Sequence, residues 1–201
     1  MTKNKERKTF GLVLIIIGIF LLLLSVFIII FNSYKENKSF DTATKDLAVL
    51  KDAMRKNVGH ENKKTEKELE IDGTKYLGII SIPKLNIELP VIKNFSYNEL
   101  AISPCRYYGS IKEHDLMIAA HNYKNFFSGI DRLNSDDKIV FTECDGTVHV
   151  YGVTYTELIN GYRSDKMFEN KDDWDLTLFT CDWSGYSRIT VRANEISDSK
   201  K

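Results

Sequence analysis

An uninterrupted apolar run near the start of the chain dominates its pattern of hydrophobic and polar positions. Residues Phe10 to Phe31 read FGLVLIIIGIFLLLLSVFIIIF, 22 residues without one charged side chain. At about 1.5 Å per residue, such a helix spans the roughly 30 Å hydrocarbon core of a bilayer. A cleaved signal peptide would have a shorter apolar region, and Asn32-Ser33 make a poor cleavage site. A buried core helix is disfavoured because the run is apolar on every face. The run predicts a membrane anchor over residues 10–31.

The next zone, residues 32–75, mixes acidic and basic side chains and contains no proline. Its apolar residues recur at helical spacing, which predicts a helix from about Thr42 to Asn57 with one narrow apolar stripe. The stripe consists of Leu47, Leu50, Met54 and Val58. The stretch from Gly59 to Glu70 has the composition of a solvated linker. We interpret the zone as a juxtamembrane helix and linker that hold the following domain away from the membrane.

From Ile71 onward, short runs rich in β-branched and aromatic residues alternate with turn residues, which is typical of β-strands. Asp145-Gly146, between two runs, is a strong hairpin signal. The predicted strands are Tyr76–Pro83, Asn86–Lys93, Asp115–Ala120, Lys138–Cys144, Thr147–Thr156, Asp175–Thr180 and Ser187–Ala193. Short helical turns fit at Tyr97–Ile102, Phe126–Leu133 and Ser164–Asn170. Many short strands with few helices predict a mainly β fold, in the form of a closed or nearly closed β-barrel.

The charge balance narrows the functional classes. The chain has 28 basic and 28 acidic residues and a formal net charge of zero, whereas nucleic-acid-binding domains usually carry a clear basic excess. We therefore expect no nucleic-acid partner. The segment before the apolar run carries four basic residues, Lys3, Lys5, Arg7 and Lys8, against a single acid. The positive-inside rule places such a tail in the cytoplasm, which predicts a single-pass protein with its carboxy-terminal domain outside the cell.

The three cysteines, Cys105, Cys144 and Cys181, share no CxxC spacing, which argues against a zinc ribbon and a dense disulfide framework. Cys181 differs from the others because it directly follows the strand DLTLFT and precedes a polar loop. A nucleophilic cysteine needs a lowered pKa or a proton acceptor, because the thiolate is the reactive form. Cys105 and Cys144 fit structural positions. We expect no metal and no cofactor, and we interpret Glu113 and Asp115 as part of a solvated turn.

Two further residues lie at strand ends where they could join Cys181. His121 ends the apolar run MIAA, and Arg188 opens the strand after the Cys181 loop. If these ends converge, a thiol, an imidazole and a guanidinium share one site, and the arginine could hold a developing oxyanion. The alternative is a small buried cysteine and a surface histidine, and spacing alone does not decide between the two. The remaining histidines, His60, His114 and His149, have ordinary structural interpretations.

The motif around Cys181 resembles that of a known enzyme family. TLFTC, residues 177–181, matches the Thr-Leu-x-Thr-Cys signature of sortases, and Arg188 follows on the next strand, as the sortase arginine does. Gly78–Val91 resembles the opening strand pair of that family, and Ile118–Leu133 resembles its histidine segment. Ala120 departs from the Gly that many sortases have before the histidine, but Ala is also small. The resemblance covers residues 76–194.

The resemblance implies a Gram-positive surface transpeptidase with a sortase-type β-barrel. Cys181 would attack the Thr carbonyl of a carboxy-terminal sorting signal, often of the Leu-Pro-x-Thr-Gly type, and form a thioester. His121 would act as general acid and base, Arg188 would steady the substrate or oxyanion, and Thr180 would contribute to substrate binding. The implied partners are secreted proteins with such a signal, an amine of a peptidoglycan precursor or of a pilin lysine as acceptor, and membrane lipid around residues 10–31.

These expectations divide the chain into four parts. They are a cytoplasmic tail over 1–9, the anchor over 10–31, the juxtamembrane helix and linker over 32–75, and a catalytic barrel over 76–196. An anchored cysteine hydrolase that uses water, or a non-catalytic surface-binding barrel, would fit the same four parts.

The sequence also leaves the subclass open. The 60 positions from His121 to Cys181 suit the compact classes A and D, while Asn122-Tyr123 resembles class B. The lack of a long lid-like insertion before the barrel argues against class C. Arg192 lies four positions beyond Arg188, and we expect it to tolerate replacement by lysine.

Overall fold

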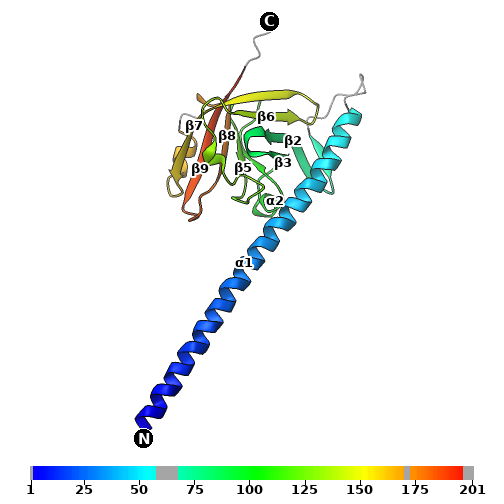
Figure 1. Cartoon of the computed structure of the whole chain (residues 1–201). Coiled ribbons are helices and arrows are strands. Elements are labelled where there is room, and N and C mark those ends of the chain that lie inside the picture. Colours follow the sequence, from blue (N-terminus) through cyan, green and yellow to red (C-terminus); the bar gives the residue numbers. More distant parts are fainter. Residues whose placement is uncertain (1, 58–67, 170–172, 197–201) are drawn as a thin grey trace. The chain divides into compact units, whose positions relative to one another are not determined.

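A computed structural model of the chain describes residues 2–57, 68–169 and 173–196, and two compact units, 1–38 and 39–201, divide the chain. The long helix α1 (Thr2–Asn57) begins in the first unit and ends in the second (Figure 1). The apolar side chains of residues 10–31 are exposed. By length and composition this part of α1 can cross a membrane. Because so continuous an apolar surface is unfavourable in water, the observation fits the predicted anchor.

The part of α1 after Lys38 packs on the barrel within the second unit. The predicted stripe is buried there, with Leu50 fully covered and Leu47 partly covered, while Val58 lies outside the described residues. The phenol of Tyr76 donates a hydrogen bond to the Asp46 carboxylate at 2.7 Å. The predicted end of this helix at Asn57 is confirmed, but its predicted start near Thr42 is wrong, because α1 continues without a break from Thr2. A role as a spacer alone is wrong for residues 39–57, because they form part of the folded unit.

In the described residues, nine strands form one sheet in the order β1-β2-β3-β4-β5-β8-β9-β7-β6, and β2 also pairs with β6. This second pairing closes β2 to β9 into a barrel, with β1 attached to β2 (Figure 1). The strands are β1 (Leu69–Ile71), β2 (Thr74–Ile82), β3 (Ile87–Ile92), β4 (Cys105–Tyr108), β5 (Leu116–Ala119), β6 (Lys138–Glu143), β7 (Val148–Asn160), β8 (Leu176–Cys181) and β9 (Ser187–Glu195). The short helices are η1 (Pro83–Leu85), α2 (Tyr97–Leu100), η2 (Ile130–Arg132) and η3 (Ser164–Met167).

Alternate residues of the strands fill the barrel. Ile80, Phe141, Leu178 and Val191, each from a different strand, are fully buried in one core cluster. β5 and β8 are buried along almost their whole length, because they form a parallel pair covered on both faces. The core therefore fixes the register of the strands that carry the candidate site, since a slip of one residue would turn the apolar set outward.

The predicted barrel is confirmed, and all seven predicted strands are present. Two strands, β1 and β4, were not predicted from the sequence. β1 is only three residues long and lies among charged residues. It overlaps the end of the predicted linker. Residues 59–67 of that linker lie outside the described residues. The turn that follows it, Asp72-Gly73, has positive φ at both residues and is itself a hairpin signal. β4 was missed because its sequence, CRYY, shows no alternation of apolar and polar residues.

The turn before β5 also differs from its prediction. Asp115 is buried rather than solvated, and its carboxylate accepts a hydrogen bond from the Ser110 N–H at 3.0 Å. The carboxylate thus satisfies a backbone donor where the chain reverses between β4 and β5. Of the predicted helical turns, the first contains α2, the second contains η2 and the third contains η3. Asn170, the predicted end of the third, lies outside the described residues.

His149 on β7 ties together three strands of the barrel. Its Nδ1 lies 2.8 Å from a carboxylate oxygen of Glu195 on β9, and its Nε2 lies 3.1 Å from one of Glu143 on β6. Both ring nitrogens face acceptors, so only the protonated imidazolium satisfies both bonds. Burial alone lowers the pKa of His149, but the hydrogen bonds and charges of Glu195 and Glu143 together outweigh it and raise the pKa above its ordinary value.

We predict that the unfolding free energy falls as the pH rises through the raised pKa of His149. A group whose pKa is higher in the folded state stabilises fully below its unfolded pKa, about 6.5, and loses this contribution as it deprotonates. Urea unfolding of the detergent-solubilised chain, followed by tryptophan fluorescence from about pH 6 to about pH 9, measures the effect. His149→Gln should flatten the curve, whereas His114→Gln, at an exposed position, should not. An unchanged slope in His149→Gln would contradict the assignment.

Candidate active site

The parallel pairing of β5 and β8 brings two of the predicted site residues together. Ala119 pairs with Phe179, and the Ala120 N–H donates to the Phe179 carbonyl at 3.1 Å, so the register continues beyond β5. Two residues beyond the pair Ala119 and Phe179 on each segment, His121 comes opposite Cys181. Neighbouring strands are about 4.8 Å apart. The imidazole of His121 and the thiol of Cys181 therefore lie at the same end of the barrel, on neighbouring segments.

The third predicted residue lies on the other side of Cys181. β8 and β9 are antiparallel, and Cys181 pairs directly with Arg188. Directly opposed residues in an antiparallel pair point to the same face of the sheet. The adjacent pair, Asp182 and Ser187, carries an N–H to carbonyl bond at 3.0 Å, so Cys181 and Arg188 form a non-hydrogen-bonded pair, in which side chains lie closest. His121, Cys181 and Arg188 thus occupy adjacent positions on three neighbouring segments of the chain.

The loop between Cys181 and Arg188 is held by its own polar groups. The Asp182 carboxylate accepts hydrogen bonds from the Ser184 hydroxyl, at 2.7 and 2.8 Å, and from the Ser187 N–H, at 3.2 Å. These hydrogen bonds lower the pKa of Asp182, and the bond from Ser184 has the largest effect. The Arg188 Nη1 donates to the carbonyls of Gly185 and Ser187, both at 3.1 Å. Nε and Nη2 of Arg188 have no partner in the described part of the chain, so they remain available to a bound carbonyl.

His121 is half-buried at the end of β5. Its ring stacks on that of Tyr123 with centroids 4.7 Å apart, and its carbonyl accepts a hydrogen bond from the Phe127 N–H. Burial lowers the pKa of His121 below its ordinary value. The imidazole is therefore mainly neutral near pH 7, which is the form that can accept a proton from a thiol.

Thr180 is placed differently from the other predicted site residues. It is 1% exposed, and its hydroxyl oxygen has no hydrogen-bond partner in the described chain. It alternates with Cys181 along β8 and points to the opposite face, toward the barrel interior. A direct contact with substrate is not available to it in this conformation. Its assignment to substrate binding stays a prediction.

The other two cysteines are fully buried. The Cys105 thiol donates to the Ser103 carbonyl and the Cys144 thiol to the Tyr76 carbonyl, each at 3.3 Å. Burial is the main cause that raises the pKa of both thiols to about 12. Thiols of this kind are protonated at neutral pH and unreactive. Cys181, which is partly exposed, is the only one of the three that solvent reaches.

Beside Cys181 lies a group of aromatic side chains that the sequence analysis did not identify. Phe179 shares the face of Cys181 on β8, and its ring contacts Tyr107 edge-on at 5.1 Å. Phe168 lies 6.5 Å from Tyr107 and 5.2 Å from Tyr108 between centroids. Tyr107, Tyr108 and Phe168 are each about two-fifths exposed, at 40%, 41% and 38%. We call these three residues and Phe179 the aromatic surface; adjacent tyrosines in the sequence were its one visible signal.

Arg192 corrects another expectation. It shares the face of Arg188 on β9, but it is 1% exposed. Its guanidinium contacts the Glu157 carboxylate at 2.9 Å and donates to the Thr177 hydroxyl at 3.0 Å. It also donates to the carbonyls of Lys166 and Met167 in η3. The η3 segment covers this part of β9, so Arg192 holds the segment that precedes Phe168, and a neutral exchange for lysine is not expected.

Comparison with known families decides the identity of the domain. The model of the sortase domain matches residues 80–196 of the chain. The chain belongs to the sortase family. Sortases are cysteine transpeptidases of the cell surface, and this family membership supports the same general activity here. No curated protein gave a significant sequence match.

Solved sortases of several classes share the fold. A *Clostridium perfringens* sortase D5 transpeptidase is 19% identical, with a TM-score of 0.55 and coverage of 81% of this chain and 99% of that one. *C. perfringens* sortase C with the carboxy-terminal cell wall sorting motif is 19% identical, with a TM-score of 0.52 and coverage of 80% and 95%. *Corynebacterium diphtheriae* sortase A is 15% identical, with a TM-score of 0.53 and coverage of 84% and 95%. Classes A, C and D match equally well, so the subclass stays open.

We predict that Arg192→Lys destabilises this sortase by about 2–4 kcal/mol, because one ammonium cannot replace a buried guanidinium bonded to four residues. Urea unfolding measures the loss. Arg163→Lys is the matched control, since Arg163 is exposed and pairs only with Asp165 in the described structure, and its effect should stay within about 0.5 kcal/mol. Equal stability of Arg192→Lys and the unchanged protein would show that the buried contacts contribute little.

Proposed function

We propose that this sortase is a membrane-anchored transpeptidase that cleaves a carboxy-terminal sorting signal and joins the released acyl group to an amine. The observation that carries the proposal is the register of β5, β8 and β9, which aligns His121, Cys181 and Arg188 at one end of the barrel. The sortase domain match over residues 80–196 supports the same assignment. The sortase C neighbour described with a cell wall sorting motif supports this class of substrate.

In the first half of the proposed reaction, His121 accepts the thiol proton and Cys181 attacks the carbonyl carbon of the scissile bond. The carbonyl electrons move to oxygen, and a free donor of Arg188 stabilises that oxyanion. When the oxyanion collapses, the carbon–nitrogen bond breaks. The leaving amine takes the proton from the His121 imidazolium, and a thioester to Cys181 remains.

In the second half, an amine attacks the thioester. Neutral His121 accepts a proton from the attacking nitrogen, the carbon–sulfur bond breaks, and the Cys181 thiolate leaves. The product is a new amide, and the thiolate regains its proton from His121. A thioester keeps much of the acyl-transfer free energy of the peptide, so the exchange needs no nucleotide. The acceptor is an amine of a peptidoglycan precursor or of a pilin lysine.

The aromatic surface suits the recognition part of this reaction. Phe179 lies two positions before the nucleophile on the same face of β8, and Tyr107 and Phe168 extend the surface away from it. Partly exposed aromatic rings bind apolar side chains and a proline ring with large contact area at low entropic cost. We propose that the residues before the scissile bond lie on this surface.

The test of the function is mass spectrometry after incubation with sorting peptides. We predict an acyl adduct on Cys181 and its transfer to an added amine, and no adduct in Cys181→Ala. Cys105→Ala and Cys144→Ala should keep the adduct, because both thiols are buried, and should cost only about 1–2 kcal/mol of stability. If the cleaved peptide were released only as its free carboxylic acid, even with amine present in excess, the protein would be a hydrolase. A folded protein that never forms an adduct with any peptide would indicate a non-catalytic barrel.

We predict that Arg188→Lys lowers the turnover by about one to three orders of magnitude, as does removal of one oxyanion donor in other enzymes. A lysine cannot hold the loop carbonyls and present further donors at the same time. Steady-state transpeptidation measures the effect, with circular dichroism to verify folding. Arg163→Lys, at an exposed position, should keep full activity. If Arg188→Lys were as active as the unchanged enzyme, Cys181 and His121 would have to act without the arginine.

We propose that residues 10–31 anchor the enzyme, with residues 1–9 in the cytoplasm and with residues 32–75 and the catalytic region 76–196 outside. Four basic residues before the span and a candidate span in α1 support this orientation. Protease added to intact protoplasts should degrade the barrel and spare the short tail. Protection of the barrel until the membrane is permeabilised would reverse the topology.

A further inference from the structure

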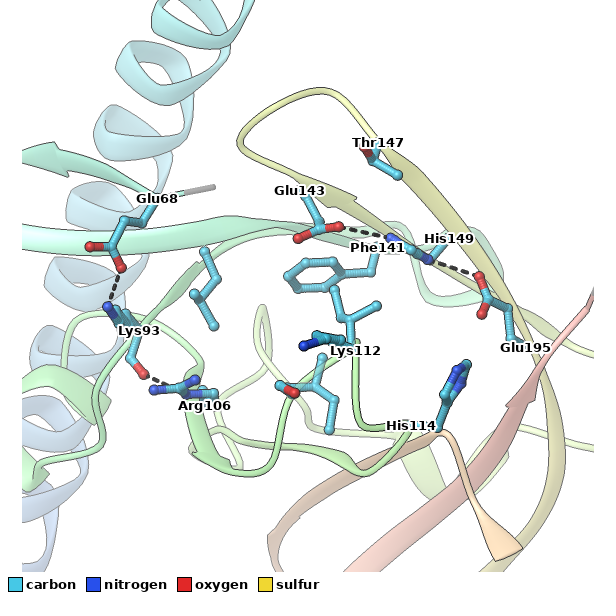
Figure 2. Close-up of a pocket in the computed structure, with 14 residues that line it drawn as sticks. Glu68, Lys93, Arg106, Lys112, His114, Phe141, Glu143, Thr147, His149 and Glu195 are labelled. Atoms are coloured by element: carbon cyan, nitrogen blue, oxygen red, sulfur yellow. Dashed lines mark hydrogen bonds and ion pairs between the residues drawn. The ribbon is translucent and has the colours of Figure 1, made fainter. Parts of the chain in front are cut away.

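Figure 2 shows a cavity of the barrel with a volume of about 610 Å³. Its lining includes Leu116 at the start of β5 and Glu195 at the end of β9. β5 and β8 run from this end of the barrel toward His121 and Cys181, so the cavity and the candidate active site are separated by the length of these strands. Its volume falls in the range of small-molecule sites, about 300–1,000 Å³. The proposed acyl transfer does not use it.

Apolar side chains line one part of the cavity. Leu116 and Phe141 are buried beneath it, and Leu77 and Ile111 are partly buried beside them. These residues come from β2, β6, the start of β5 and the turn before it. An apolar group that entered the cavity would therefore replace water against four apolar side chains, which is favourable.

The carboxylates that line the cavity are already paired. Glu68 forms an ion pair with Lys93, and Glu143 and Glu195 hold His149 between them, as Figure 2 shows. Each of these carboxylates already has a partner in the same chain, and Glu143 and Glu195 share the single charge that a protonated His149 supplies. These carboxylates are thus poor candidates for binding an organic cation.

Two cations that line the cavity, Arg106 and Lys112, have no ion pair within the described residues. The Nε of Arg106 donates to the Lys93 carbonyl at 3.0 Å, and its two Nη groups have no partner in the described residues. Lys112 has no ion pair or hydrogen bond with any described residue. In Figure 2, Lys112 lies near the middle of the group, below Phe141. A guanidinium fork and an ammonium thus border an apolar cavity.

We propose that this cavity binds a small organic anion, a carboxylate or phosphate monoester that carries an apolar group. The anion pairs with Arg106 and Lys112, which supply charge-assisted hydrogen bonds. The apolar group lies against Leu116 and Phe141. The combination disfavours inorganic phosphate, which has no apolar part, and organic cations, which would be repelled by Arg106 and Lys112.

The test is a saturation-transfer NMR titration of the full chain in nanodiscs. The probes are phenyl phosphate and phenylacetate, which separate the two anion chemistries. Benzyl alcohol, phenethylammonium and inorganic phosphate are the controls for charge and for the apolar group. At least one anionic probe should bind and the three controls should not. Binding of benzyl alcohol or phenethylammonium as tight as that of both anions would overturn the proposal, and so would the absence of binding by both anions.

Variants locate the bound anion. Arg106→Gln and Lys112→Gln should each weaken probe binding about fivefold or more, because each removes one charged partner of the anion. Lys138→Gln, at the other end of β6 from Glu143, is the control and should leave probe binding unchanged. Lys112 is exposed in a turn, so its variant keeps the test valid if Arg106→Gln fails to fold. Cys181→Ala should bind the probe normally, which separates this site from the catalytic one. Binding unaffected by both pocket variants would place the anion elsewhere.

Discussion

The candidate site depends on one interaction, the parallel pairing of β5 with β8. Parallel strands run in the same direction, so the residues that follow them leave the barrel at the same edge. The pairing of Ala119 with Phe179 then determines that His121 lies beside Cys181, although 60 positions separate them. The antiparallel pairing of β8 with β9 adds Arg188 on the other side. The geometry of the site is a consequence of backbone register, which the apolar core enforces on both strands.

The register explains why some features were predictable and others were not. Strand alternation and the Asp145-Gly146 turn are local signals, and they predicted seven strands and a closed or nearly closed barrel. TLFTC pointed to Cys181 as the proposed nucleophile through family resemblance, whereas the spacing of Cys181 and His121 alone left a structural role open. β4 lacks alternation because it is short and carries exposed tyrosines. The aromatic surface joins residues from three separate segments, and the adjacent tyrosines of β4 alone do not reveal that Phe168 and Phe179 lie beside them.

Arg192 shows the limit of arguments from strand parity. Parity correctly put Arg188 and Arg192 on one face of β9, but it contained no information about what covers that face. The η3 segment lies over Arg192 and leaves Arg188 at the edge, so two arginines four residues apart have different environments. Arg192 bonds buried carbonyls and a carboxylate, whereas Arg188 has free donors beside Cys181, the proposed nucleophile. A similar division separates the two ends of the barrel, since the cavity near Arg106 and Lys112 shares strands with the catalytic end but no residues.

Disulfide trapping tests the central claim, the adjacency of residues 121 and 181, most directly. In a Cys105→Ala, Cys144→Ala background, His121→Cys places a second thiol opposite Cys181, with α-carbons about 5 Å apart, inside the range that a disulfide spans. Mild oxidation and peptide mass spectrometry should then find a bond between residues 121 and 181. Asn122→Cys, one residue farther along, should form little. A bond in Asn122→Cys without one in His121→Cys would show that the register is different and that His121 does not lie beside the nucleophile.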